Sequence, residues 1–409
     1  MKSFNGLFEA MTDHEEIKRA IREAADHKKR RPEVKRALRE IDEKAEEIRK
    51  KLLSGKWHPP KHSKSRLCEG SHKKTRMIEK PRWDDEQIVH HVLMRQFRKI
   101  VLPRFYRYSC GSIPGRGPHY AVKTMKRWRD GYQGKRFYVA ELDIKSFYDS
   151  VDVTILKAML RKTIRDKRYL DVLFRVIDTG APGLPKGFYT SPWLANFLLT
   201  PLDNHITQNL RPDHYLRYMD NMYLFARSKK KLHRMVREIS EYLGVNLHLR
   251  LKEDWQVFRF EGESRKAKKE TPQITSATGK KKKPKRPPGR AINCLGFVIH
   301  NNRITMRKSI LKRARAKANR MHRKRRCTRK DASAIISYMG WFSHTDTYKY
   351  YLKWIKPKVS VQYCKRRISA ISKKQAKGAK KNDRLARSAG QSDGGSRRAR
   401  HDLELDHRL

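Results

Sequence analysis

Three separated segments carry the residues that could perform chemistry. They are ELDIKSFYDSVD at 141–152, GLPKGFYTSPWLANFLLTPLD at 183–203 and LRYMDNMYLF at 216–225. Asp143 follows a hydrophobic run, and Asp220 lies between two apolar runs. Carboxylate oxygens suit hard divalent cations and leave positions open for phosphates. If the fold brings the two together, they could hold two metal ions about 3.5–4 Å apart, which activate a hydroxyl and stabilise a departing pyrophosphate.

Both aspartates are expected at the ends of strands. Residues 138–144 read YVAELDI, and such β-branched and aromatic side chains are typical of a buried strand. The apolar residues around Asp220 and Asn221 predict two strands joined by a turn. Apolar spacings of three and four predict helices at 153–164, 193–206 and 229–243. The fold class of this region is therefore α+β.

The segments before this region are more mixed. Pro32 begins one predicted amphipathic helix, which Gly55 ends. A helix-like stretch follows at 85–100, and residues 76–78 form a short candidate strand.

The segments after it differ in composition. Residues 262–290 are dominated by Lys, Pro, Gly, Thr and Ser, which cannot build a packed core, so we expect an inserted basic loop. Asn301 and Asn302 could turn a hairpin. Residues 308–372 have a pattern typical of helices, and we expect the tail 373–409 to be disordered.

The charge of the chain points to a polyanionic partner. Its 409 residues include 99 Lys and Arg against 42 Asp and Glu, a formal net charge of +57. This excess excludes most enzymes of small metabolites, and no apolar run reaches the ~20 residues of a membrane span. A nucleic acid is the simplest partner that would compensate this positive charge, because Lys and Arg side chains can replace the counterions condensed on its phosphates. Residues 307–330 hold thirteen Lys or Arg and no acidic residue, so we expect them to contact a nucleic-acid backbone.

Other patterns give weaker signals. The five cysteines are scattered and form no C-x-x-C pair, which indicates reduced thiols in a cytosolic protein. His90 and His91 lie on an apolar stretch without matching metal ligands, so we expect packed histidines. Gly115 and Gly117 lack the context of a dinucleotide fold and predict a turn, with template phosphates as a neighbour. The N-terminus has no signal-peptide pattern, so we expect a soluble intracellular protein.

The order of these blocks resembles the reverse transcriptase family. ELDIKSFYDSVD, LPKG-x-x-x-SP-x-LAN, YMDN and NCLGF resemble its palm motifs. KKTRMIEKPRWDDEQIVHHVL and YRYSCGSIPGRGPHYAV look like the fingers of bacterial members, and SYMGWFSHTDTYKYYLKWIKP looks like their thumb. The resemblance covers roughly residues 50–370. It implies a right-hand polymerase with fingers, a palm of antiparallel sheet plus helices, and a helical thumb.

The resemblance also implies domain boundaries. We expect an N-terminal helical extension at 1–60, and fingers and palm at 61–299 with the basic insertion. A helical basic thumb would follow at 300–372, before the basic tail.

The resemblance assigns roles to individual residues. Catalytic positions are Asp143, Asp220, Asn221 and Lys252, and the metal ligands are the two aspartates with the carbonyl of Ile144. The expected dNTP-binding residues are Lys74, Arg76, Ser146, Phe147, Tyr148, Lys186 and Gly187. The expected nucleic-acid contacts are Ser191, Lys312, Arg313, Arg320, Arg323 and Lys324. Three alternatives stay open: Lys73 could replace Lys74, Tyr148 could be a core aromatic, and Lys252 a surface lysine.

Two departures from the family pattern bear on activity. Asn221 stands where the family has a second Asp, which removes one negative charge and is expected to weaken metal affinity without abolishing it. Lys186 stands where many retroviral-type members carry Gln. It also differs from the apolar residue of diversity-generating retroelements, although the fingers, thumb and size look closest to that bacterial branch.

The expected function is RNA-directed DNA synthesis. The chain would add dNTPs to a primer 3′ end with two Mg²⁺ ions, or Mn²⁺ in their place, on a template RNA to give cDNA. A structured noncoding RNA is an expected partner, an accessory protein or a second copy another, and a membrane is not. The setting would be a retroelement or an antiphage defence system in the cytoplasm, bacterial or phage-encoded. The alternative is a weakened or silenced RNA-binding protein that keeps the polymerase fold.

Overall fold

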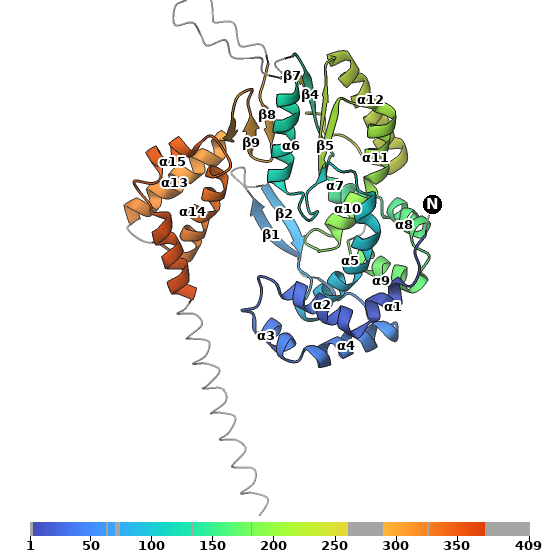
Figure 1. Ribbon diagram of the computed structural model, residues 1–409. Coiled ribbons are helices and arrows are strands. Elements are labelled where there is room, and N and C mark those ends of the chain that lie inside the picture. The colour runs from blue at the N-terminus through green and yellow to red at the C-terminus, as the bar shows by residue number, and fades with distance from the viewer. Residues whose placement is uncertain are drawn as a thin grey trace, which may run out of the picture. The chain divides into compact units, whose positions relative to one another are not determined.

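The computed structural model describes residues 3–62, 64–69, 74–132, 135–180, 182–260, 289–324 and 327–372. The chain divides into two compact units, Met1–Ile292 and Asn293–Leu409 (Figure 1). The predictions for the basic loop over 262–288, for the tail 373–409 and for Lys73 lie outside the described residues.

Four short helices begin the first unit: α1 (Leu7–Thr12), α2 (His14–Ala25), α3 (Pro32–Arg39) and α4 (Ile41–Leu53). The prediction of one helix from Pro32 onward is wrong in detail. Glu40 leaves the helical region with φ −104° and ψ 47° and divides the segment in two. The break lets both short helices bury an apolar face, with Val34 of α3 and Ile48 of α4 fully inside.

A hairpin and a helix come next in the chain. β1 (Lys64–Glu69) pairs antiparallel with β2 (Lys74–Glu79), which includes the predicted strand at 76–78. The predicted helix at 85–100 is confirmed as α5 (Ile88–Val101), which is preceded by a π-helical turn, η1 (Trp83–Gln87), and followed by η2 (Leu102–Arg104).

The centre of the first unit is a five-stranded sheet in the order β3-β5-β6-β4-β7. Its strands are β3 (Ser109–Cys110), β4 (Tyr138–Asp143), β5 (His214–Tyr218), β6 (Asn221–Ala226) and β7 (Gln256–Arg259). β3 runs parallel to β5, and the other three pairs are antiparallel. β4 and β6 lie side by side, and β6 is buried on both faces from Met222 to Ala226. The predicted strands around Asp143 and Asp220 are therefore neighbours.

Further helices belong to the first unit (Figure 1). They are α6 (Pro118–Gly131), α7 (Phe147–Ser150), α8 (Val153–Thr163), α9 (Lys167–Asp178), α10 (Ser191–Leu198), α11 (Thr200–His205), η3 (Ile206–Leu210) and α12 (Lys229–Leu247). Among them, α6 and α12 pack against the sheet. The helices predicted at 153–164 and 229–243 are confirmed. The one predicted at 193–206 is two helices, because α10 ends at Leu198 and the chain restarts at Thr200 with Pro201 in the first turn.

The second unit pairs a small sheet with helices. β8 (Ile292–Cys294), β9 (Phe297–Ile299) and β10 (Ile304–Met306) form a sheet in the order β10-β9-β8. β9 and β10 pair antiparallel, with the predicted Asn301–Asn302 turn between them. α13 (Lys308–Lys324), α14 (Arg329–Phe342) and α15 (Tyr348–Trp354) follow, and residues 361–372 are also helical. Among the described residues no helix combines the length and apolar character needed to cross a membrane.

Candidate active site

The sheet brings Asp143 and the Asp220–Asn221 turn together where the neighbouring strands β4 and β6 meet at one end. Asp143 is the last residue of β4, and it lies opposite Asn221, the first residue of β6. The main-chain N–H of Ile144 donates to the Asp220 carbonyl over 3.3 Å. Cross-strand partners point to the same face of a sheet, so Asp143 and Asn221 share one face. The preceding pair, Leu142 and Met222, is buried on the other.

Within the described residues, the carboxylate of Asp143 has one oxygen that no protein group satisfies. Its Oδ1 is buried and has no hydrogen-bond partner within the described residues. Its Oδ2 pairs with the ammonium of Lys252. A buried carboxylate oxygen without a donor carries a large desolvation cost, which a cation relieves. The oxygen donors of this site therefore fit a hard divalent ion.

Lys252 reaches Asp143 because the chain after α12 returns to the end of β4. Its main-chain N–H donates to the Asp143 carbonyl over 2.8 Å, and Lys145 donates in the same way to Arg250. Ile144 and Leu251 form an isolated antiparallel bridge between these two bonds. The backbone therefore fixes Lys252 beside Asp143.

Asn221 can donate a hydrogen bond from its side-chain amide, which an aspartate at this position could not do. Its Nδ2 donates to the Asp220 Oδ1 over 3.3 Å. A second carboxylate here could only accept hydrogen bonds and would repel Asp220. Asn221 therefore holds its neighbour's side chain while it contributes no charge to the site.

A buried arginine, Arg217, donates a hydrogen bond to the turn that carries Asp220. Arg217 on β5 is fully buried, and its guanidinium pairs with Asp203 of α11 through two bonds, of 2.8 and 2.6 Å. Its Nη1 also donates to the carbonyl of Met219 over 3.1 Å and to Asn196 over 2.9 Å. Register places Arg217 opposite Met222, on the sheet face away from Asp143.

These bonds hold a strained backbone. Met219 has φ +54°, a left-handed conformation that is costly for a residue with a side chain. Its N–H donates to Cys110 over 3.0 Å, and Gly111 leaves room for its side chain, since a Cβ there would lie 2.8 Å from the Met219 Cγ. Sequence reasoning missed Arg217 and Asp203. The available signal was a charged residue within the otherwise apolar strand before YMDN.

The predicted LPKG segment forms a tight connection to the β1–β2 hairpin. The Glu79 N–H donates to the Lys186 carbonyl over 2.9 Å. Gly187 has φ +106°, and a Cβ there would lie 2.5 Å from the Glu79 carbonyl oxygen. Only glycine tolerates both conditions. The close approach that Gly187 allows is thus to β2 itself.

Lys186 and Ser191 have partners inside the protein. The Lys186 ammonium pairs with Asp149 over 2.5 Å, which ties this segment to α7. Ser191 is 1% exposed, and its hydroxyl donates to the Pro185 carbonyl over 2.6 Å. A residue this buried presents no surface to a nucleic acid, so we leave Ser191 out of the interface proposed below.

The segment after Asp143 places the remaining predicted residues. Ser146 is exposed, with φ +48°, and precedes α7. Phe147 is buried, whereas Tyr148 is partly buried with its ring centre 5.7 Å from that of Phe147. The Tyr148 carbonyl accepts from Leu184 over 2.8 Å, which connects this segment to LPKG.

The other predicted residues lie elsewhere. Lys74 and Arg76 belong to β2, and their side chains lie outside the described part of the chain. In the second unit, α13 buries Ile310, Ala314, Ala318 and Met321. The predicted nucleic-acid contacts on α13 are all exposed: Lys312, Arg313, Arg320, Arg323 and Lys324.

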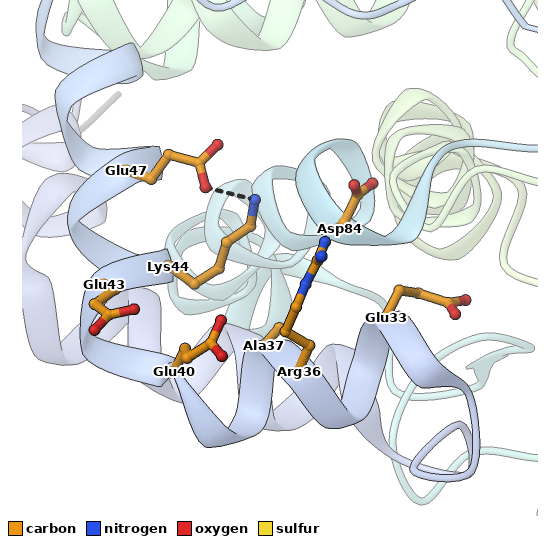
Figure 2. A pocket seen from close by; sticks show the side chains of 8 residues that line it. All are labelled: Glu33, Arg36, Ala37, Glu40, Glu43, Lys44, Glu47 and Asp84. Carbon is orange, nitrogen blue, oxygen red and sulfur yellow. Dashed lines mark hydrogen bonds and ion pairs between the residues drawn. The ribbon is translucent and has the colours of Figure 1, made fainter. Parts of the chain in front are cut away.

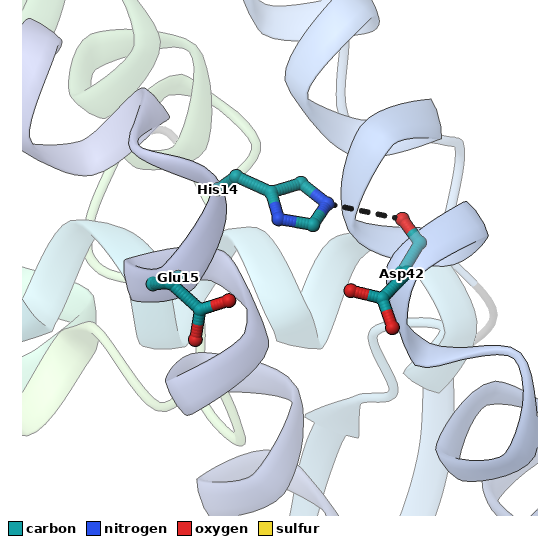
Figure 3. Close-up of side chains that lie close together, drawn as sticks. All are labelled: His14, Glu15 and Asp42. Atoms are coloured by element: carbon teal, nitrogen blue, oxygen red, sulfur yellow. Dashed lines mark hydrogen bonds between the residues drawn. The ribbon is translucent and has the colours of Figure 1, made fainter.

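A second group of possible metal ligands is already neutralised. His14, Glu15 and Asp42 offer ligand atoms within 4.8 Å of one another (Figure 3). The ammonium of Lys18 lies 2.7 Å from both Glu15 and Asp42. His14 contacts the Asp42 main-chain oxygen over 3.2 Å. An internal cation thus takes the place that a metal ion would need.

An acidic cavity of about 260 Å³ lies between α3 and α4 (Figure 2). Its lining residues are Glu33, Arg36, Ala37, Glu40, Glu43, Lys44, Glu47 and Asp84. Carboxylates outnumber cations there, and Lys44 pairs with Glu47 over 2.8 Å. This face would repel phosphates.

Comparison with known proteins gives one family. Residues 60–258 match the reverse transcriptase (RNA-dependent DNA polymerase) family. YkfC of Escherichia coli is 28% identical over 170 residues, which are 39% of this chain and 44% of YkfC. The group II intron-encoded protein LtrA of Lactococcus lactis is 28% identical over 177 residues, 41% of this chain and 29% of LtrA. The chain thus spans less than half the length of these relatives. Among solved structures, an apo telomerase from Candida tropicalis has a TM-score of 0.41 at 11% identity, covering 64% of this chain and 59% of that one.

Proposed function

Residues 60–258 belong to the reverse transcriptase family, and on this premise we propose that the chain is an RNA-directed DNA polymerase. It adds dNTPs to the 3′ end of a primer paired to an RNA template. One observation carries the proposal: Asp143 lies in register with Asn221, beside the Asp220 turn, with an unsatisfied carboxylate oxygen.

Asp143, Asp220 and the Ile144 carbonyl would hold two Mg²⁺ ions, or Mn²⁺ in their place. Bound there, the ions lower the pKa of the primer hydroxyl and stabilise the departing pyrophosphate. Lys252 would give a proton or a positive charge to that pyrophosphate once Asp143 no longer holds its ammonium, and the pairing of the two side chains supports this role. Tyr148, five residues after Asp143, would exclude a ribose 2′-OH.

The remaining dNTP contacts belong to the segments joined at LPKG. Ser146, Phe147, Lys186 and Gly187, with Lys74 and Arg76 on β2, would line the nucleotide site. The bond between Glu79 and Lys186 supports this, because it joins β2 to the segment that carries Lys186.

We assign the parts of the chain on the same premise. Residues 1–60 are an N-terminal helical extension, 61–299 the fingers and palm, and 300–372 a basic thumb. The exposed cations of α13, with no acidic residue on that helix, support a contact between the thumb and the phosphate backbone.

A structured RNA is the proposed physiological partner. LtrA is named as a group II intron-encoded protein, and another relative as a nuclear intron maturase of Arabidopsis thaliana, 31% identical over 95 residues. The net charge of +57 exceeds what one short heteroduplex requires. A cytoplasmic retroelement or antiphage defence system is the proposed setting, with an accessory protein or second copy as a further partner.

Primer extension tests the proposal. Purified chain, an RNA template with an annealed DNA primer, dNTPs and Mg²⁺ should give extended DNA, and Asp143→Ala should abolish it. Asp171→Ala is the matched control, because this carboxylate is exposed on α9, away from the residues of the proposed site. Extension by Asp143→Ala at the wild-type rate would overturn the proposal.

The second candidate function is RNA binding without catalysis. Asn221 favours it, because the site has one carboxylate fewer than the family pattern. Under this reading neither wild type nor Asp143→Ala extends a primer, with Mg²⁺ or Mn²⁺, while both bind RNA equally well.

A further inference from the structure

A basic hollow on the first unit is separate from the aspartates. It has a volume of about 260 Å³ and is lined by Arg107, Tyr120, Lys123, Thr124 and Arg127. Four of these residues form a stripe along α6, at helical spacings of three and four, and Arg107 comes from the segment before β3. α6 packs against β3 and β5, whereas Asp143 ends β4.

In the described part of the chain, the three cations of this hollow have no acidic partner. Arg107, Lys123 and Arg127 are exposed, and none forms an ion pair within the part of the chain that the structure describes. Their neighbours on α6 behave differently, since Lys126 and Arg129 both pair with Asp130, at 2.9 and 2.6 Å. The charge of the hollow is thus left uncompensated, although a carboxylate is available on the same helix.

The two guanidinium groups are held in place by one aromatic ring. Arg107 lies over the ring of Tyr108 at 5.4 Å, and Arg127 donates to its hydroxyl over 3.1 Å. Tyr108 itself packs edge-on against the buried Trp128 at 4.8 Å. The positions of both cations are therefore set before any ligand arrives, which lowers the entropy cost of binding an anion.

Tyr120 gives the hollow an aromatic wall. It is half-buried, and its hydroxyl donates to the Arg107 carbonyl over 3.5 Å. An aromatic ring among cations is the combination that holds a nucleotide of a single strand, with the base on the ring and the phosphates on the cations. A paired duplex hides its bases and could not use this ring.

We propose that this hollow binds a single-stranded segment of nucleic acid, apart from the polymerase site. The ligand is a phosphodiester strand with one unpaired base against Tyr120. The inference concerns binding alone, so it does not depend on whether the chain polymerises DNA.

The test compares a triple variant with a matched control. Arg107→Gln, Lys123→Gln and Arg127→Gln together remove the charge of the hollow but keep polar side chains, and Lys126→Gln removes a charge that Asp130 already neutralises. All proteins carry Asp143→Ala, and the buffer contains no divalent ion, so catalysis plays no part. Thermal unfolding of the triple variant should match that of the control, because the three side chains are exposed.

Binding of a labelled single-stranded RNA is measured by fluorescence anisotropy between about 50 and 200 mM salt. Each phosphate contact on a single strand contributes about 0.7 to the slope of log affinity against log salt, so the triple variant should lose about 2 from that slope. Lys126→Gln should keep the slope of the unsubstituted protein. A single-stranded DNA of the same sequence is run in parallel, and the strand with the larger loss identifies the ligand. Equal slopes for the triple variant and the control with both strands would overturn the proposal.

Crosslinking gives an independent readout. RNA that contains 4-thiouridine should crosslink to the peptide that carries Tyr120, and Tyr120→Leu should remove this crosslink while those on α13 persist. Crosslinks confined to α13 would also overturn the proposal.

Discussion

Lys252 is attached to Asp143 twice, through its main-chain N–H on the Asp143 carbonyl and through its ammonium on the carboxylate. The ammonium pairs with Oδ2 of the carboxylate whose other oxygen, Oδ1, is the candidate metal ligand. Metal binding and the salt bridge therefore compete for the same carboxylate.

Replacing Lys252 separates its two effects. If Lys252 is the proposed proton donor, Lys252→Met should lower the extension rate by roughly 10²-fold. It should also lower the Mg²⁺ concentration that gives half-maximal rate, because the competing cation is gone. A Mg²⁺ titration of primer extension measures both values, with Lys145→Met, an exposed neighbour, as the control. An unchanged rate would show that Lys252 takes no part in the reaction.

Asn221→Asp should strengthen metal binding. A second carboxylate adds a negative charge beside Asp220, and affinity for hard cations rises with ligand charge. We expect the half-maximal Mg²⁺ concentration to fall roughly tenfold, which is about 1.4 kcal/mol. Asn246→Asp on the exposed surface of α12 is the matched control. Equal Mg²⁺ dependence in both variants would place position 221 outside the metal site.

Arg217 should affect both stability and the catalytic turn. Arg217→Met leaves Asp203 buried without a counter-charge, which should cost about 3–5 kcal/mol of unfolding free energy. Adding Asp203→Leu removes the second charge and should restore part of that stability. If Arg217 positions the turn through the Met219 carbonyl, the double variant should still extend primers slowly. Urea unfolding and primer extension on the same samples separate the two effects, and full activity in the stable double variant would contradict positioning.

The buried His90 should make stability fall in acid. Neither ring nitrogen has a hydrogen-bond partner within the described residues, although Nε2 lies 3.7 Å from the Glu86 carboxylate, and burial lowers the pKa of His90 to about 3. The unfolded chain takes up this proton below about pH 6.5, whereas the folded protein does not, so stability is unaffected above that pH. Between pH 6.5 and 3 it should fall by up to about 1.4 kcal/mol per pH unit from this group.

His90→Phe should reduce this acid sensitivity. The ring of His90 already packs against Phe188 at 4.8 Å, so a phenyl ring suits the same position. The difference in unfolding free energy between pH 7 and pH 5, measured with urea, should shrink by about 2 kcal/mol. The exposed His322→Gln should leave it unchanged. An equal pH dependence in His90→Phe and wild type would mean that His90 is protonated in the folded state.

Local pattern was enough to predict much of the framework. The strands that end at Asp143 and begin at Asn221 follow from apolar and β-branched runs, and α5, α8 and α12 from helical periodicity. The predicted helix boundaries were wrong where a periodic run contained a break, as at Glu40. The spacing of apolar residues does not reveal a single residue that leaves the helical conformation.

The sequence by itself determined which residues could do chemistry, because the aspartates follow recognisable apolar runs. Tertiary structure alone decided what each one contacts. Lys252 and Asp143 are 109 residues apart, and Lys186 and Asp149 are 37. Arg217 looks like an isolated charge in a strand until α11 places Asp203 against it. No local pattern encodes such pairs. They are set by the register of the strands and by the path of the chain between them, and both depend on how the whole core packs.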